Sequence, residues 1–306
     1  MDKRVNVLVV GTTGMLGGKI AAALLDRGAT PRLLIRPGGY AGDKAARIAA
    51  LTARGATVVE ADLAAGTGLE AAVADIDVIV SAVQGQKDII IGGQSALLEA
   101  AERAGVGRFI PSDFSVDFFS LEDGSNRNLD LRRHFNRRLD SSPVAGTSVL
   151  NGAFMEMLVF GFPLLDRQTG QYVVWGDPEQ TLQFTSTDDT AEFTAEVALD
   201  QNAPRKVCVA GAQVSQIALQ SILERWLGVP LERHTAGDAS ALTAEIEREK
   251  REAPGGEGDL FPRWQALQYL HNMVSGAGFM PQLDNGRYPA VRPVSLPDFL
   301  QRIPPP

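Results

Sequence analysis

The stretch that decides the fold is Val5-Asn6-Val7-Leu8-Val9-Val10-Gly11-Thr12-Thr13-Gly14-Met15-Leu16-Gly17. Its first half is almost entirely apolar and β-branched, which is typical of a parallel strand buried on both faces. Its second half has the spacing G-x-x-G-x-x-G and opens a helix that we expect from Leu16 to Arg27. A strand, a glycine-rich turn and a helix in this order predict a turn that binds phosphate groups.

Each glycine of this turn has its own physical role. Gly11 permits the tight turn, Gly14 lets the backbone approach a pyrophosphate, and Gly17 lets the helix pack closely on the strand. The helix start adds free N–H groups and a positive partial charge. The alternative is a purely structural turn without a ligand. We favour dinucleotide binding, with contacts from Gly11, Thr13, Gly14, Met15, Leu16 and Gly17.

The rest of the chain divides into two regions. Residues 1–150 alternate strand and helix patterns, which predicts an α/β fold, a doubly wound parallel sheet of Rossmann type. After Leu150 the rhythm changes, and a hairpin is expected within 172–184, turning at Trp175-Gly176-Asp177-Pro178. We predict that residues 151–306 form mainly a smaller α+β region that binds substrate, with segments near 186–210 returning to the sheet.

Charge and cysteine content exclude several classes of protein. The 306-residue chain has a net charge of -8, and an acidic surface repels nucleic acid. Its one cysteine, Cys208, excludes an internal disulfide and a thiolate metal site. The three histidines, His134, His234 and His271, lack the spacing of metal ligands. We therefore expect neither a metal nor a nucleic-acid partner.

Two further observations concern the cellular location. No apolar run approaches the ~20 residues that span a bilayer. Met1 to Arg4 leads directly into the first strand and not into the apolar core of a signal peptide. These observations predict a cytoplasmic protein that does not bind membranes.

The end of the second strand indicates which dinucleotide binds. It reads Leu34-Ile35-Arg36-Pro37, without the acidic residue that would hold the ribose hydroxyls of NAD. Arg36 can instead pair with a 2′-phosphate, and Lys44 and Arg47 add positive charge in the next helix. We therefore predict NADP(H). Asp62, at the end of the third strand, either lies near the adenine or caps the following loop.

One apparent catalytic motif is interpreted as coincidence. Tyr40 and Lys44 have the Y-x-x-x-K spacing of many short-chain dehydrogenases. In those enzymes the pair lies on a helix after the fourth strand, where the lysine lowers the tyrosine pKa. Here it follows the second strand, beside the expected adenosine end.

Several longer stretches carry a resemblance to a known family. They are Gln94 with Leu98-Glu-Ala-Ala-Glu-Arg-Ala-Gly105, Arg108-Phe-Ile-Pro-Ser-Asp-Phe114, and Arg287-Tyr-Pro-Ala-Val-Arg-Pro293 with Asp298-Phe-Leu300. Together with Gly11 to Gly17 and Arg36, they make the chain similar to the NmrA-like and isoflavone reductase-like family of atypical short-chain dehydrogenases. That family includes phenylcoumaran benzylic ether and pinoresinol–lariciresinol reductases, and the similarity covers nearly the whole chain.

The resemblance implies an activity and further site residues. NADPH would lie across the strand ends, and hydride would pass to a bulky aromatic substrate of phenylpropanoid, lignan or isoflavonoid type. The cofactor would also contact Ala82, Val83, Ser112 and Phe154. An apolar wall beside the substrate would consist of Phe154, Met155 and Met157, for which ordinary core packing is the open alternative.

The catalytic residues implied by the resemblance include one departure from the family. In the plant reductases a lysine on the helix after the Pro-Ser-Glu-Phe motif contacts the nicotinamide ribose and moves a proton. Arg138 falls where we expect that lysine, and the chain has no lysine between Lys87 and Lys206. Arginine stays protonated, so it cannot act as a base, but it can hold the ribose or an oxyanion.

Histidine offers a second catalytic candidate. His271 matches a histidine over the substrate pocket of the lignan reductases, and acid–base work and helix packing are both open for it. We therefore predict an NADPH-dependent reductase of a small aromatic substrate, with Arg138 and His271 as its catalytic residues. The missing lysine keeps a second function open, a non-catalytic NADP(H) sensor of the NmrA-like type. A homodimer is also left open.

Overall fold

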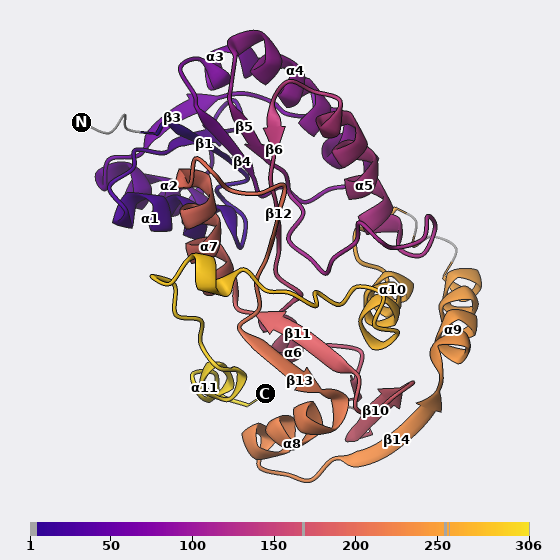
Figure 1. Ribbon diagram of the computed structural model, residues 1–306. Coiled ribbons are helices and arrows are strands. Elements are labelled where there is room, and N and C mark those ends of the chain that lie inside the picture. The colour runs from indigo at the N-terminus through magenta and orange to yellow at the C-terminus, as the bar shows by residue number, and fades with distance from the viewer. Residues whose placement is uncertain (1–4, 167–168, 254–255, 257, 306) are drawn as a thin grey trace.

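The computed structural model describes residues 5–166, 169–253, 256 and 258–305. Met1 to Arg4, on which the signal-peptide argument rests, lie outside this part of the chain. No helix within it is long and apolar enough to cross a membrane. Figure 1 shows the sheet of the N-terminal half at the top and the smaller sheets and helices of the C-terminal half below it.

The central feature is a parallel sheet of six strands in the order β3-β2-β1-β4-β5-β6. Its register pairs β1 directly with β2 on one side and with β4 on the other. The strand order therefore reverses between β1 and β4, and ligands bind at such a point, beyond the carboxyl ends of the strands. The predicted Rossmann-type fold class is confirmed. The strands are β1 Val7–Val10, β2 Arg32–Ile35, β3 Thr57–Glu60, β4 Val78–Ser81, β5 Arg108–Ile110 and β6 Ala145–Gly146.

Helices cover both faces of this sheet because successive residues of a buried strand point to opposite sides. Val7 and Val9 belong to the core cluster under one set of helices, α1, α2 and α7. Leu8 belongs to the cluster under the other set, α3, α4 and α5. The helices are α1 Gly17–Asp26, α2 Gly42–Ala53, α3 Leu69–Val73, α4 Gln94–Ala104, α5 Arg127–Asp140 and α7 Thr187–Leu199.

The segment near 186–210 lies with the N-terminal elements. Helix α7 packs along α1, as Figure 1 shows, and Lys19 of α1 forms an ion pair with Asp188 at 2.7 Å. Strand β12 (Lys206–Cys208) pairs in parallel with β7 (Ser148–Leu150). These two strands form a separate two-stranded sheet, and β7 directly follows β6 of the large sheet in the chain.

The C-terminal half contains two small sheets and a shared apolar core. One sheet has the order β13-β11-β8 and the other β14-β10-β9. Their inner faces and the surrounding helices bury a cluster that includes Tyr172, Phe184 and Leu270. The strands are β8 Ala153–Phe154, β9 Leu165–Asp166, β10 Gln171–Trp175, β11 Thr181–Thr185, β13 Ala212–Ser215 and β14 Glu232–Gly237; the helices are α6 Glu156–Phe160, α8 Gln216–Leu227, α9 Ala239–Glu252, α10 Arg263–Val274 and α11 Leu296–Gln301.

The predicted hairpin within 172–184 is wrong. Strands β10 and β11 belong to different sheets. The side chain of Gln216, at the start of α8, forms hydrogen bonds with the backbone where β10 ends and the chain turns toward β11. It donates to the carbonyls of Trp175 and Asp177 at 2.7 and 2.9 Å, and it accepts from the Trp175 N–H at 3.2 Å. These backbone groups are thus satisfied by a side chain distant in sequence and not by strand pairing.

The family-like motif near the C-terminus and the preceding Asp284 fasten the tail to β12 and to the end of α7. Asp284 accepts from the Cys208 N–H at 2.8 Å and so covers the outer edge of β12. Arg287 donates to Asp200 at 2.8 Å, and the Tyr288 hydroxyl donates to the same carboxylate at 3.1 Å. The motif therefore has a structural role, since none of these residues lines the cavity described below.

Candidate functional site

A cavity of about 630 Å³ lies at the carboxyl ends of the parallel strands. This volume is within the usual range for a site that holds a small molecule or cofactor. The cavity runs from the end of β2, past the glycine-rich turn, to the ends of β4 and β5. Its lining includes Gly11, Thr13, Gly14, Met15, Leu16, Arg36, Tyr40, Lys44, Asp62, Ala82, Val83, Gln84, Asp88, Ile89, Ser112, Phe114, Arg132 and Phe154.

The glycine-rich turn is held by backbone contacts that leave no space for side chains. A Cβ on Gly11, whose φ is +85°, would lie 2.4 Å from the Ala82 carbonyl oxygen. A Cβ on Gly17 would lie 2.3 Å from the Gly11 carbonyl oxygen. Gly14 differs, because the nearest atom to its Cβ is 3.2 Å away and the residue lines the cavity. Gly17 does not line it, so its role is to let α1 pack against the turn.

Positive side chains gather at the β2 end of the cavity. Arg36, at the end of β2, and Lys44, in the first turn of α2, both line it. The Lys44 ammonium lies 5.8 Å from the centre of the Tyr40 ring, so the coincidental Y-x-x-x-K pair is at this end, as its position in the sequence predicts. Asp62 caps its own loop by accepting from the Ala64 and Ala65 N–H groups at 2.9 and 3.0 Å, and it also lines the cavity.

The opposite end of the cavity is built from the ends of β4, β5 and β7. The Ser112 hydroxyl donates to the Val83 carbonyl at 2.7 Å, which ties β5 to β4. The Ser112 N–H donates to the buried Gln94 side chain at 3.1 Å. Phe114 and Phe154 add aromatic surface to the lining. This end therefore offers apolar walls around a backbone that is already hydrogen-bonded.

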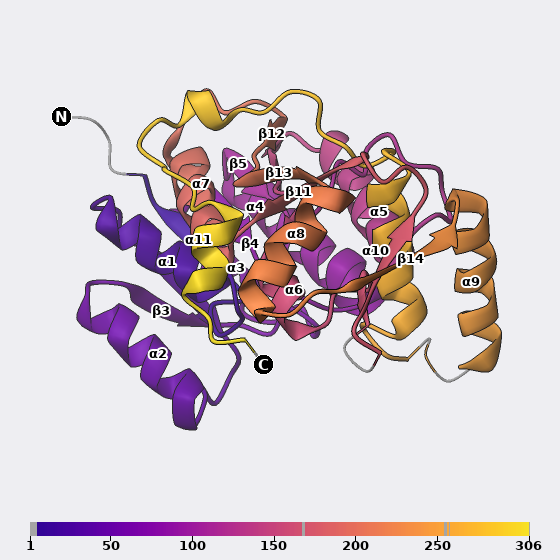
Figure 2. The same cartoon turned by 90° about the horizontal axis from the view of Figure 1, so that it is seen from below.

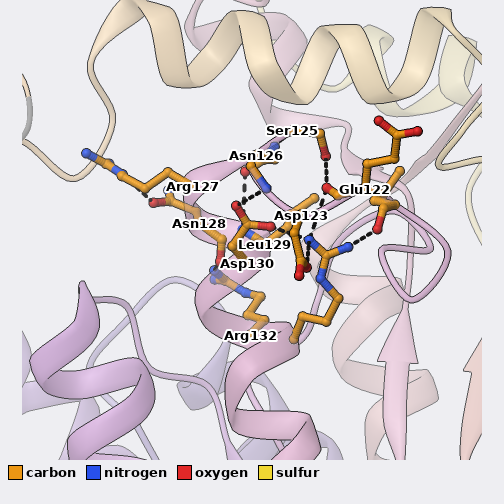
Figure 3. Close-up of polar contacts among 12 residues, drawn as sticks. Glu122, Asp123, Ser125, Asn126, Arg127, Asn128, Leu129, Asp130 and Arg132 are labelled. Atoms are coloured by element: carbon orange, nitrogen blue, oxygen red, sulfur yellow. Dashed lines mark hydrogen bonds and ion pairs between the residues drawn. The ribbon is translucent and has the colours of Figure 1, made fainter.

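One cation, Arg132 on α5, lies at this apolar end. Its Nε donates to the Ser112 carbonyl at 2.8 Å, and its Nη1 donates to the Asn128 carbonyl at 2.8 Å. Figure 3 shows Arg132 reaching back to Asn128 at the start of α5. Its Nη2 has no hydrogen-bond acceptor within the described part of the chain. The guanidinium is thus fixed by two backbone carbonyls and keeps one nitrogen free for a ligand.

The predicted position of Arg138 in the site needs correction. Arg138 lies about one and two-thirds turns beyond Arg132 on α5, and its guanidinium binds both carboxylate oxygens of Glu102 on α4 at 2.9 Å. It does not line the cavity. Six residues on a helix rotate a side chain by about 120° from its starting direction, so Arg138 points away from the site that Arg132 faces.

The predicted catalytic position of His271 needs the same correction. Its ring is bonded to the Thr243 hydroxyl at 3.2 Å and to the Ala239 backbone, both on α9. Burial lowers the pKa of His271, against the opposing effect of the Ala239 hydrogen bond. The residue does not line the cavity, so the structure supports the helix-packing alternative.

The predicted apolar wall is only partly present at the cavity. Phe154 lines it. Met155 is fully buried in the C-terminal core, and Met157 is 40 % exposed. Phe154 ends β8, Met155 precedes α6 and Met157 lies within it, so the change from strand to helix turns the three side chains in different directions.

A buried polar network lies beneath Arg132. The carboxylate of Asp113, directly after Ser112, accepts from the Ser148 hydroxyl at 2.6 Å and from the Asn136 amide at 2.8 Å. Arg205 donates to Ser148 at 2.9 Å and to Asn136 at 2.5 Å. Burial raises the pKa of the Asp113 carboxyl, although these hydrogen bonds and the positive charges of Arg132 and Arg205 lower it. The network fixes α5 to the ends of β5 and β7.

The sequence did not identify several residues of the cavity. Gln84 and Phe114 follow the ends of β4 and β5 by three and four residues, so the rule of converging strand ends could have found them. Asp88 and Ile89 belong to a π-helical segment, Asp88–Gly93, that has no clear sequence pattern. Arg132 stands among four arginines within seven residues of α5, and only the helix rotation distinguishes it.

The donor set suits a phosphorylated dinucleotide. The close-packed glycine turn gives the phosphates access to backbone N–H groups, and Arg36 and Lys44 supply positive charge beside it. No group of three or more histidine, cysteine, aspartate or glutamate side chains among the described residues is arranged to hold a metal ion.

Comparison with known proteins gives one family and a consistent set of relatives. The model of the NmrA-like family matches residues 3–248. The bifunctional pinoresinol–lariciresinol reductase 1 of Linum usitatissimum is 27% identical over 231 residues, covering 73% of this chain and 74% of that protein. Pinoresinol reductase 1 of Arabidopsis thaliana is 27% identical over 279 residues, covering 85% of this chain and 86% of that protein.

Solved structures show the same fold over almost the whole chain. A structure of AtPrR2 with NADP+ and (+)-pinoresinol has a TM-score of 0.83 at 24% identity and covers 99% of both chains. The leucoanthocyanidin reductase–NADPH complex from Vitis vinifera has a TM-score of 0.80 at 22% identity, covering 97% of this chain and 98% of that one.

Two glycine substitutions should separate binding from folding. Gly14→Ala adds a methyl group that faces the cavity, so we expect NADP+ to bind roughly tenfold more weakly, with little change in the free energy of unfolding. Gly17→Ala forces a methyl group against the Gly11 carbonyl, so we expect a loss of about 1–3 kcal/mol in the free energy of unfolding. Calorimetric titration with NADP+ and urea denaturation measure the two effects. Equal losses of stability in both variants would contradict this assignment.

The buried Asp113 carboxyl should make stability depend on pH. Its pKa is raised in the folded state, so the folded protein binds the proton more readily than the unfolded chain does. The wild type should therefore gain stability relative to Asp113→Asn as the pH falls from 7 through the raised pKa toward the ordinary carboxyl range. Urea denaturation of both proteins at several pH values tests this. Parallel stability curves would show that the carboxyl does not titrate as expected.

Proposed function

Since this chain belongs to the NmrA-like family, we propose that it is an NADPH-dependent reductase that transfers hydride to a bulky aromatic substrate of phenylpropanoid, lignan or isoflavonoid type. One observation carries the proposal. A single cavity joins a phosphate-binding turn and two cations at one end to a fixed cation and two phenylalanines at the other. Relatives of similar length that act as pinoresinol–lariciresinol reductases support the substrate type.

Different residues of the cavity would contact different parts of the cofactor. The N–H groups of the turn from Gly11 to Gly17 would hold the pyrophosphate at the start of α1. Arg36 and Lys44 would hold the 2′-phosphate at the β2 end, which accounts for NADPH in place of NADH. Ala82, Val83, Ser112 and Phe154 line the half of the cavity where the nicotinamide would lie. When bound, NADPH supplies the hydride.

The chain's own contribution at the nicotinamide half is orientation and charge. Phe114 and Phe154 provide apolar surface on which an aromatic ring can stack. Arg132 provides a permanent positive charge in a half-buried position, where a charge acts more strongly than in water. Arg132 therefore takes over the role that the sequence alone assigns to Arg138.

A second candidate function, an NADP(H) sensor without catalysis, is favoured by one observation. Among the described residues that line the cavity, no histidine occurs, and the one lysine, Lys44, lies at the β2 end. Such a protein would bind the cofactor and signal through a partner. The reductase is preferred because Arg132 and the two phenylalanines extend the cavity beyond the phosphate turn.

Transfer of an isotope label decides between the two functions. We would incubate the protein with NADPH deuterated at nicotinamide C4 and a panel of lignans, isoflavones and aromatic enones, and analyse the products by mass spectrometry. A reductase places deuterium on a carbon of the product. Tight NADPH binding without label in any product would favour the sensor.

A matched pair of arginine variants tests the site. Arg132→Gln removes the charge at the apolar end and should lower kcat/KM by about 10²-fold, the usual cost of removing one stabilising donor. Arg138→Gln breaks a surface ion pair and should change kcat/KM less than twofold. Steady-state kinetics with the best acceptor of the panel measure both. The reverse ranking would restore Arg138 as the functional residue.

A further inference from the structure

Strand β3 leaves one side of the large sheet without a neighbour. It is the terminal strand of the six and pairs only with β2. Toward β2, the Thr57 N–H donates to the Pro31 carbonyl at 3.0 Å, and the Ala61 N–H donates to the Ile35 carbonyl at 2.9 Å. Because donors alternate in direction along a strand, the N–H and C=O groups of Val58 point to the open side, where no described residue bonds to them. This side can therefore accept a further strand.

The open edge of β3 lacks the features that usually prevent such pairing, which are charged side chains, proline, a bulge or a very short strand. It reads Thr57-Val-Val-Glu60, has the same length as β1 and β2, and carries one charge. Its Val58 side chain is 39 % exposed. By contrast, the edge strand β14 exposes Glu232, Arg233 and His234, and β6, at the other end of the large sheet, has two residues. Of these three edges, β3 is the one suited to pairing.

Helix α2 lies on the same face of the sheet as the Val58 side chain. Val58 is in register with Leu33 of β2, which belongs to the core cluster under α2. Arg54, at the end of α2, donates to Asp26 of α1 at 2.6 Å, so the flank of α2 that carries Arg54 faces α1. The opposite flank therefore lies on the open side of β3. Figure 2 shows α2 and β3 together at the periphery of the molecule.

This outer flank of α2 carries small or uncharged side chains. A rotation of about 100° per residue places the positions i, i+3, i+4 and i+7 on one side of a helix. Here they are Ala45, Ile48, Ala49 and Thr52, of which Ala49 and Thr52 are exposed. Together with Val58 they form an uncharged surface on a chain with a net charge of -8. Two copies of such a chain repel each other least where they meet through an uncharged surface.

We propose that the protein forms a two-fold symmetric homodimer through β3. The β3 strand of a second copy pairs with it antiparallel, about a two-fold axis at Val58, and joins the two six-stranded sheets into one continuous sheet. The outer flanks of the two α2 helices pack beside each other over the junction. This inference does not depend on the proposed reductase function.

Hydrogen bonding and charge together select this register. Opposite residues of an antiparallel pair must both present their N–H and C=O groups to the other strand. Val58 and Glu60 are the residues of β3 that do so, which allows an axis at Val58 or at Val59. An axis at Val58 sets the two valines opposite each other and separates the two Glu60 positions by about 14 Å along the strands, beyond the screening length of salt. An axis at Val59 would reduce that separation to about 7 Å.

The remaining bonds fit the axis at Val58. The Glu60 N–H of each copy meets the Ala56 carbonyl of the other. The Ala56 N–H already donates to the Leu51 carbonyl at 3.1 Å, so this end of the ladder forms one bond in place of two. Val58 and the outer flank do not line the cavity, so the dimer leaves both cavities open.

Sedimentation equilibrium of the full chain, from about 1 to 100 µM, tests for the dimer. We expect a monomer–dimer equilibrium with a dissociation constant in the micromolar range, because the contact belongs to the smaller class of interfaces. A single species of monomer mass at every concentration would overturn the proposal.

Substitutions of Val58 test the position of the contact. Val58→Asp sets two carboxylates opposite each other and should raise the dissociation constant at least about 100-fold. Val58→Thr keeps a β-branched residue in the strand and should change it less than about fivefold. Val229→Asp makes the same change as Val58→Asp at a valine that is 54 % exposed elsewhere, and should leave it unchanged. A dimer that Val58→Asp does not weaken would show that the copies meet through another surface.

A matched pair on α2 provides a test that does not alter the strand. Ala49 and Ala50 are adjacent, exposed and about 100° apart around the helix, with Ala49 on the outer flank. Arginine is a good helix former, so both variants should fold. Ala49→Arg should raise the dissociation constant at least about tenfold, and Ala50→Arg less than about twofold. Circular dichroism and NADP+ affinity check the fold of each variant. Equal effects of the two substitutions would contradict the packing of α2 against α2.

Cross-linking tests the two-fold axis directly. An axis at Val58 places the two Cα atoms of this residue about 5.5 Å apart, so bismaleimidoethane should join two copies of Val58→Cys but not of Val229→Cys. The native Cys208 is buried, which raises the pKa of its thiol to about 11 and protects it from the reagent near neutral pH. A dimer that Val58→Cys does not cross-link, or equal cross-linking of both variants, would overturn the proposed axis.

Discussion

The structure depends on how closely the backbone of the first βα turn approaches its neighbours. A Cβ would lie 2.4 Å from Ala82 at Gly11 and 2.3 Å from Gly11 at Gly17, so only glycine fits at either position. These contacts pack the start of α1 against Gly11, and Gly11 against Ala82 directly after β4, so that the helix begins beside the cavity. The cavity then extends from this turn in two directions, toward the end of β2 and toward the end of β5.

The cavity carries positively charged side chains although the chain as a whole is negatively charged. The protein carries a net charge of -8, yet the cavity holds Arg36 and Lys44 at one end and Arg132 at the other. The first two are exposed side chains at the end of a strand and the start of a helix, where they are free to adapt to a phosphate. Arg132 is held by backbone carbonyls, so it presents its charge in one direction. Only the fixed cation is suited to select between substrates by geometry.

The sequence predicts those parts of the site that follow from the ends of parallel strands. Gly11, Arg36, Asp62 and Ser112 could be placed because strands of one sheet bring their carboxyl ends to the same edge. Arg138 was misplaced because the choice among the four arginines between residues 132 and 138 depends on helix rotation, which the resemblance of short motifs does not fix. The hairpin was misplaced for a related reason, since Gln216, about forty residues away, satisfies the backbone where a strand partner was expected. The sequence therefore places residues at the cavity where strand ends alone decide, and it misplaces them where helix rotation or a distant side chain decides.

The position of Arg132 also explains why the buried network beneath it is polar and not apolar. Asn136 lies four residues after Arg132, on the same side of α5, and its amide donates both to Asp113 at 2.8 Å and to the Arg132 carbonyl at 2.9 Å. An apolar contact would hold the helix against the sheet but would leave it free to rotate or slide. Directional bonds at two successive turns, from Arg132 to the Ser112 carbonyl and from Asn136 to the Asp113 carboxylate, oppose both motions. These bonds hold the Arg132 guanidinium in one position at the apolar end of the cavity.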